Sequence, residues 1–157
     1  KKIKKINNKS KIKSYRIRLD KCNIEKLIKK YDIICDGTDN FETRFLINDQ
    51  SLKQKKVLIS AAVSGFEGHI FKFDFRRKTP CYRCFMPEDP GQHNNCDSLG
   101  VTPTITGIIG TLQANEVLNS ILNFKSNMEK KLIVFNSIKM SFRKVNLSRN
   151  NNCKNKC

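Results

Sequence analysis

The apolar and polar residues of this 157-residue chain follow two different periods, and each period predicts a kind of element. Alternation and short apolar runs predict strands, whereas apolar residues three and four positions apart predict helices. The predicted strands cover residues 14–19, 33–35, 57–62, 71–75, 132–135 and 140–147, and the predicted helices cover 24–30, 41–54 and 107–122. Strands and helices that alternate in this way are typical of an α/β fold.

Two strands carry opposite patterns. Residues 33–35 form an unbroken apolar run, which predicts a buried parallel strand with an inert structural thiol at Cys35. The phenylalanines of 71–75 alternate with Lys72 and Asp74, which predicts a half-exposed antiparallel strand. In the helix over 41–54, Asn48 interrupts the apolar stripe. Residues 86–100 hold two prolines and two glycines and predict a loop long enough to be functional.

The charge of the chain is concentrated at its ends. The formal net charge is +17, but residues 1–30 hold thirteen Lys and Arg against two acids, whereas residues 31–124 hold nine against eleven. We therefore expect solvated termini, with residues 1–13 as a flexible basic lead-in, and we favour this over binding to RNA or an acidic partner. Without a long apolar run or an apolar leader, the pattern predicts one intracellular domain, in the cytoplasm or an organelle stroma.

The cysteines change the picture more than the charge does. Seven is an odd number, and no secretory leader places them in an oxidising compartment, so metal binding or thiol chemistry is favoured over a disulfide framework. Cys81 and Cys84 form a C-x-x-C in a turn-like context, and Cys153 and Cys157 form a second pair. Two such pairs can supply the four thiolates of a structural zinc site. A redox C-x-x-C and unpaired surface thiols are the alternatives.

Five collinear stretches resemble one enzyme family. They are DGTDNFETRFLIND (36–49), SGFEGHIFKFD (64–74), PCYRC (80–84), NCDSLGVTPTITGIIGTLQANEVL (95–118), and Arg149-Asn150 ahead of Cys153. From about residue 33 to residue 153 the chain resembles the ThiF/MoeB group of sulfur-carrier adenylyltransferases, relatives of the ubiquitin-activating enzymes. It is similar to the C-terminal portion of such a domain, because no G-x-G-x-x-G follows a strand before Asp36.

The resemblance implies a Rossmann-like fold, with a mostly parallel sheet, an antiparallel extension and a four-cysteine zinc site. It implies that Asp39 holds the Mg²⁺ that bridges the phosphates of ATP, and that Asn40 and Arg44 line the nucleotide site. A plain helix cap for the Asp-Asn pair and a surface salt bridge for Arg44 are the alternatives. Cys96 matches the cysteine that takes over the activated carrier in ThiF-like relatives, and an exposed bystander thiol is its alternative.

The implied reaction is ATP-dependent adenylation of the Gly-Gly carboxylate of a ubiquitin-like sulfur carrier, for molybdopterin, thiamine or thiolated tRNA. Relatives are homodimers. Because the Gly-rich half is absent, we expect the chain not to catalyse this step alone. A non-catalytic, zinc-stabilised module that binds a carrier or a homologous subunit is the second hypothesis. The second cysteine pair also departs from the family, since it reads C-x-x-x-C where relatives have C-x-x-C.

Overall fold

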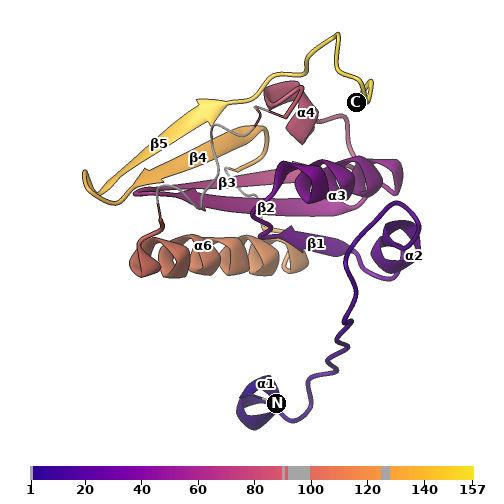
Figure 1. Ribbon diagram of the computed structural model, residues 1–157, viewed down its shortest axis with the longest axis vertical. Helices are drawn as coiled ribbons and strands as arrows, with labels where there is room; N and C mark the ends of the chain where they lie inside the picture. Colours follow the sequence, from indigo (N-terminus) through magenta and orange to yellow (C-terminus); the bar gives the residue numbers. More distant parts are fainter. Residues whose placement is uncertain (1, 90, 92–99, 125–127) are drawn as a thin grey trace.

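The computed structural model describes residues 2–89, 91, 100–124 and 128–157. A single five-stranded sheet, in the order β1-β2-β3-β4-β5, carries helices on both faces (Figure 1). The strands are β1 (Ile33–Asp36), β2 (Val57–Ser64), β3 (Glu67–Asp74), β4 (Lys131–Asn136) and β5 (Ser141–Asn146). The helices are α1 (Lys2–Ile6), α2 (Ile24–Ile28), α3 (Phe41–Lys53), α4 (Tyr82–Phe85) and α6 (Pro103–Ile121).

The sheet is mixed, which confirms the α/β class but corrects the expected balance of strand directions. Only β1 and β2, joined through α3, run parallel among the described strands. The pairs β2–β3, β3–β4 and β4–β5 are antiparallel. The reason lies partly in the connections, because a two-residue link at Gly65 (φ 54°) and the short link after β4 can only reverse the chain.

One face of the sheet packs against α3 and α4, and its core is aromatic. The ring of Tyr82 lies 5.6 Å from that of Phe71 in an edge-to-face contact, and Phe73 and Phe75 are buried in the same cluster. On the opposite face, the Lys72 ammonium lies 3.3 Å from Glu116 of α6. The prediction of a half-exposed strand over 71–75 is therefore wrong, because the polar positions of β3 face a second covered layer.

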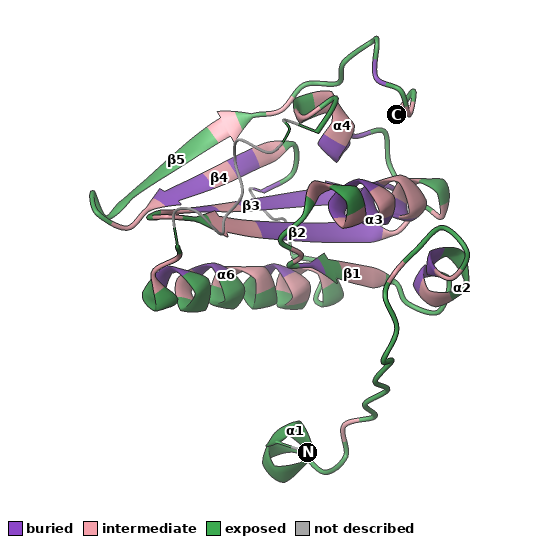
Figure 2. Cartoon of the chain, in the orientation of Figure 1, coloured by how far each residue is buried: buried purple, intermediate pink, exposed green. Residues whose placement is uncertain are grey.

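Helix α6 covers that second layer (Figure 2). It packs on β2 and β3 through Ile105 and Ile109, and a Cβ added to Gly68 of β3 would overlap the Ile109 side chain. Glycine is thus what lets the helix approach the strand closely. The helix begins four residues before the predicted start, with Pro103 in its first turn, where a missing N–H removes no helical hydrogen bond.

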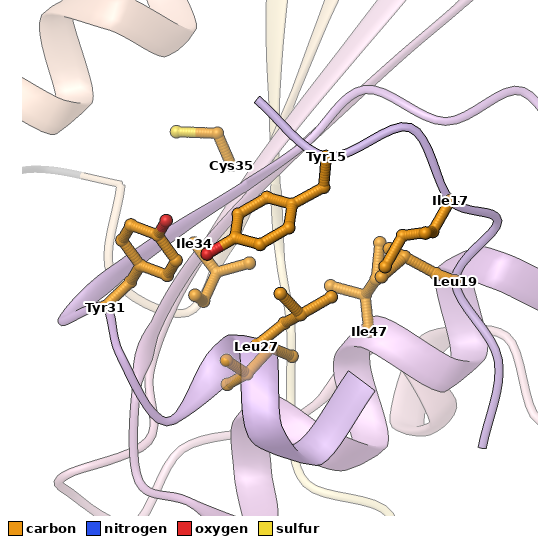
Figure 3. A pocket seen from close by; sticks show the side chains of 9 residues that line it. Tyr15, Ile17, Leu19, Leu27, Tyr31, Ile34, Cys35 and Ile47 are labelled. Carbon is orange, nitrogen blue, oxygen red and sulfur yellow. The ribbon is translucent and has the colours of Figure 1, made fainter. Parts of the chain in front are cut away.

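The N-terminal segment departs most from prediction. Residues 14–19 form no ladder in the described structure, so the predicted strand is wrong. Tyr15, Ile17 and Leu19 instead line an apolar pocket of about 300 Å³ against α2, α3 and β1 (Figure 3). Cys35 also lines this pocket and is exposed, which corrects its predicted burial: β1 is an edge strand of the described sheet. Helix α1 is exposed throughout.

Candidate functional site

The loop that follows β1 lies at the carboxyl end of the parallel strand pair, where open α/β folds bind ligands. Asp36, the last residue of β1, leads into this loop and is 1% exposed. One carboxylate oxygen accepts hydrogen bonds from the backbone N–H of Thr38 (2.9 Å) and from its hydroxyl (2.7 Å). The other oxygen accepts a hydrogen bond from the hydroxyl of Ser60 on β2 (2.7 Å). Asp36 is therefore committed to the interior.

Arg44 lies beneath the same loop. Its Nε is 3.9 Å from the Asp36 carboxylate, and its Nη2 donates to the carbonyl of Thr38. The side chain is buried, and Nη1 has no hydrogen-bond partner among the residues that the structure describes. The surface salt bridge considered for Arg44 is therefore wrong, because both partners are interior. Arg44 instead neutralises the charge of Asp36 and holds the loop through its hydrogen bond to the Thr38 carbonyl.

Asp39 and Asn40 lie on the outside of the loop, and both are exposed. Asn40 is the N-cap of α3, since its Oδ1 accepts from the backbone N–H of Thr43 (2.9 Å). Its Nδ2 lies 3.3 Å from Oδ1 of Asp39. The capping interpretation is thus confirmed for Asn40, whereas Asp39 keeps an accessible carboxylate, the oxygen ligand that Mg²⁺ prefers. Of the two acids, Asp39 fits a metal and Asp36 does not.

Two residues of this site were not singled out from the sequence. Ser60 stands inside an apolar strand, and Gln113 stands in the middle of α6. The Gln113 Nε2 donates to the carbonyl of Asp36 (2.9 Å) and to that of Ile59 (2.8 Å). A lone polar residue within an apolar run is the signal that could have identified Ser60, because a buried polar group needs a partner. Gln113 carried no such signal, because Thr111, Asn115 and Glu116 stand close to it in the same helix.

Four cysteines converge beside α3, next to Asn48 and Asp49. The sulfur atoms of Cys81, Cys84, Cys153 and Cys157 all lie within 4.8 Å of one another. The Sγ–Sγ distances are 3.6 Å for Cys81–Cys153, 3.2 Å for Cys84–Cys157 and 3.8 Å for Cys153–Cys157. A tetrahedron with Zn–S bonds of about 2.3 Å has edges of about 3.8 Å, whereas a disulfide needs about 2.05 Å. The thiol geometry therefore fits a zinc ion.

The cysteine cluster is anchored to α3 by polar side chains. Asn48, which appeared in the sequence as a break in the apolar stripe, is fully buried and accepts from the backbone N–H of Tyr82 (2.8 Å). The next residue, Asp49, pairs with Arg83 at 2.8 Å and accepts from Nδ2 of Asn155 at 2.6 Å. The segment with Cys81 and Cys84 and the segment with Cys153 and Cys157 are thus bonded to two consecutive residues of α3.

The pKa of the Asp49 carboxyl and the pKa of the Cys81 thiol are shifted in opposite directions. Burial alone would raise the pKa of Asp49, but hydrogen bonds from Arg83, Asn155 and Asn48 and the charge of Arg83 outweigh it and lower that pKa. Burial raises the pKa of the Cys81 thiol to about 11. A cation at the cluster would supply the positive charge that this buried thiolate needs.

Cys96, the predicted nucleophile, lies outside the described residues, as does most of the loop over 86–100. The loop at Asp39 and the cysteine cluster are therefore the two parts of the predicted site that the structure describes. The loop precedes the N-terminus of α3, and the cluster is bonded to Asn48 and Asp49 of the same helix. None of the helices in the described part of the chain combines the length and the apolar character that crossing a bilayer requires.

Comparison with known proteins agrees with this architecture. The chain is 38% identical over 151 residues to a probable molybdopterin-synthase adenylyltransferase of Gracilaria tenuistipitata var. liui, covering 96% of this chain and 42% of that protein. It is 30% identical over 159 residues to a sulfur carrier protein adenylyltransferase of Thermus thermophilus, covering 98% and 59%. The chain thus spans about two fifths to three fifths of these relatives.

Among solved structures, Escherichia coli MccB has the same fold, with a TM-score of 0.76 at 15% identity, over 99% of this chain and 48% of that one. The ThiF family profile matches residues 1–155, which include the basic N-terminal segment. From the family match and the identity to curated relatives, this chain belongs to the ThiF family.

Proposed function

We propose that this chain is the metal-binding and zinc-stabilised portion of an enzyme that uses ATP to adenylate the C-terminal Gly-Gly carboxylate of a ubiquitin-like sulfur carrier. The observation that carries the proposal is that two acids close in sequence, Asp36 and Asp39, differ in their exposure to solvent. Asp36 is buried and fully hydrogen-bonded, whereas Asp39, three residues on, presents its carboxylate to solvent at the carboxyl edge of the sheet. The names of the relatives support the same activity.

In this proposal Asp39 is the ligand of Mg²⁺, and Asn40 and Arg44 shape the loop around the nucleotide. Mg²⁺, when bound with ATP, would neutralise the phosphate charge that builds up as the carrier carboxylate attacks. Asn40 fixes the direction of α3 by capping it, so the positive end of the helix dipole faces the same edge. Arg44 supports the loop through Thr38.

The four cysteines have an architectural role in this proposal. A zinc ion held by Cys81, Cys84, Cys153 and Cys157 would fasten the C-terminal tail to the segment that follows β3. Cys96 is proposed as the acceptor of the activated carrier. We also propose that the protein works as a homodimer in the cytoplasm or an organelle stroma, in molybdopterin, thiamine or tRNA thiolation.

A chimaera tests the activity. This chain replaces the matched segment of the Thermus thermophilus relative, and carrier-dependent exchange of pyrophosphate into ATP is measured beside zinc content and thermal melting. We expect exchange, and we expect Asp39→Ala to lower it on the order of a hundredfold or more while zinc content and melting stay unchanged. A folded, zinc-loaded chimaera without exchange would overturn the proposal.

One observation favours the second hypothesis, a non-catalytic module that binds a carrier. The described residues hold both the cysteine cluster and the five-stranded sheet, which are the parts that a zinc-stabilised binding module needs. Both hypotheses expect no exchange from the isolated chain, so binding is the test of the second: a binding module retains a ubiquitin-like carrier without ATP.

A further inference from the structure

We propose that Asp36 is a positioning residue that sets the place of the Asp39 carboxylate, with Ser60 and Gln113 as its supports. This inference rests on the proposed role of Asp39 as a Mg²⁺ ligand. None of the three residues touches the proposed metal. Each acts on the backbone that leads to Asp39, and together they tie that backbone to both layers of the fold.

Asp36 is held from both faces of the sheet. Its carboxylate points to the α3 side, where it accepts from Ser60 and Thr38 and faces Arg44. Its carbonyl is held from the opposite side, by the Gln113 amide of α6. The same amide holds the Ile59 carbonyl on the neighbouring strand. The end of β1 is therefore fixed relative to α3, α6 and β2 at once.

The link from Asp36 to Asp39 runs through Thr38. The Asp36 carboxylate accepts from both the N–H and the hydroxyl of Thr38, and Arg44 holds the Thr38 carbonyl. All three polar groups of Thr38 are thus engaged by interior charges. Asp39 follows directly, and Asn40 is locked as the cap of α3. Asp39 is a single residue between these two fixed points, so its backbone, from which the carboxylate extends, has little freedom to move.

The arrangement depends on the balance of two buried charges and is therefore sensitive to the loss of a single hydrogen bond. Asp36 and Arg44 are 1% and 5% exposed, so each charge depends on the other and on its hydrogen bonds. Removing the Ser60 hydroxyl leaves one Asp36 oxygen with Arg44 as its remaining partner, at 3.9 Å. The carboxylate then gains by turning towards Arg44 and away from Thr38, and this rotation frees the loop without emptying the core.

Paramagnetic NMR on the 157-residue chain measures this directly. Manganese chloride is titrated into ¹⁵N-labelled protein, and the broadening of the amide signals of residues 38–40 reports metal at Asp39. We expect Ser60→Ala to raise the Mn²⁺ concentration for half-broadening at least fivefold in protein that stays folded, with a melting temperature lowered by only a few degrees, because one buried Asp36 oxygen loses a hydrogen bond. Asp36→Asn is expected to do the same where it folds. Ser64→Ala, at the exposed end of β2, is the matched control and is expected to change nothing.

Asp39→Asn separates the two proposals. If it abolishes the local broadening while Ser60→Ala and Gln113→Met leave it unchanged, Asp39 binds the metal and the positioning role is refuted. If Asp39→Asn itself has no effect, the metal role of Asp39 fails and the positioning inference fails with it. A fivefold weakening in Ser60→Ala together with loss in Asp39→Asn supports both.

Discussion

The Nδ2 atom of Asn155 lies 2.6 Å from Oδ1 of Asp49, although 106 positions separate the two residues. This contact joins the tail between the last two cysteines to the middle of α3. Arg83, between the first two cysteines, binds the same carboxylate through Nε and Nη2. Asp49 therefore contacts both halves of the cysteine cluster, and its substitution should weaken the proposed zinc site as well as the fold.

Asp49→Asn is expected to destabilise the protein by about 1–2 kcal/mol, because it leaves the Arg83 guanidinium, 15% exposed, without its counter-charge. The loss stays below that of a fully buried pair since 35% of the Asp49 side chain is exposed. Urea unfolding measures it. Glu25→Gln is the control: its partner Lys53 is 66% exposed, so a change below about 0.5 kcal/mol is expected. Equal effects of the two substitutions would contradict the anchoring role.

Zinc is expected at about one ion per chain in protein purified without chelator. Cys153→Ser should abolish it, because Cys153 is 5% exposed and, within the described ranges, no further His, Cys, Asp or Glu joins the four sulfurs. Chelation of the wild type should lower the melting temperature, since metal binding contributes to folding. Cys22→Ser, at an exposed thiol away from the cluster, should change neither quantity. Metal-free protein with an unaltered melting curve would refute the structural role of zinc.

Gly68→Ala is expected to destabilise the fold by about 1–3 kcal/mol, since the added Cβ overlaps Ile109 and forces α6 away from β3. Gly110→Ala is the matched control, because nothing lies within 4 Å of its added Cβ and alanine favours a helix interior by roughly 0.5–1 kcal/mol. A double substitution, Gly68→Ala with Ile109→Ala, should cost less than the sum of the single ones. Additive costs would show that the two side chains do not meet.

Cys96→Ala, placed in the chimaera, is expected to keep pyrophosphate exchange but to lose a thiol-sensitive conjugate with the carrier. A missing nucleophile abolishes the second step without affecting the first. Mass spectrometry after mixing enzyme, carrier and ATP measures the adduct. An adduct that persists in Cys96→Ala would assign the covalent step to another residue.

Local signals predicted much of the fold and part of the site. The predicted helix over 41–54 agrees with α3 to within one residue, because Asn40 is a cap that acts on its own neighbours. The convergence of Cys81 and Cys84 with the C-terminal pair was predicted from spacing and resemblance, and the structure confirms that their sulfurs meet.

The errors arose where a residue's partner is distant in sequence. Lys72 in an alternating strand suggested solvent, but its partner is Glu116, 44 positions away on a helix. Asp36 and Asp39 look alike in the sequence, and only the neighbouring strand with Ser60 shows which acid is buried. Residues 14–19 alternate as a strand does, yet pairing requires a neighbouring edge, which local periodicity cannot supply.

The distance in sequence between the two cysteine pairs also sets when the cluster can form during synthesis in the cell. Cys81 and Cys153 stand 72 positions apart, with α6, β4 and β5 between them. A ribosome adding about 5–20 residues per second needs roughly 4 to 14 s to make that interval. During this interval Cys81 and Cys84 lack the second cysteine pair, so their thiols can be oxidised or can bind a competing metal. The proposed zinc ion can therefore be held by all four thiolates only after Cys153 and Cys157 have been made.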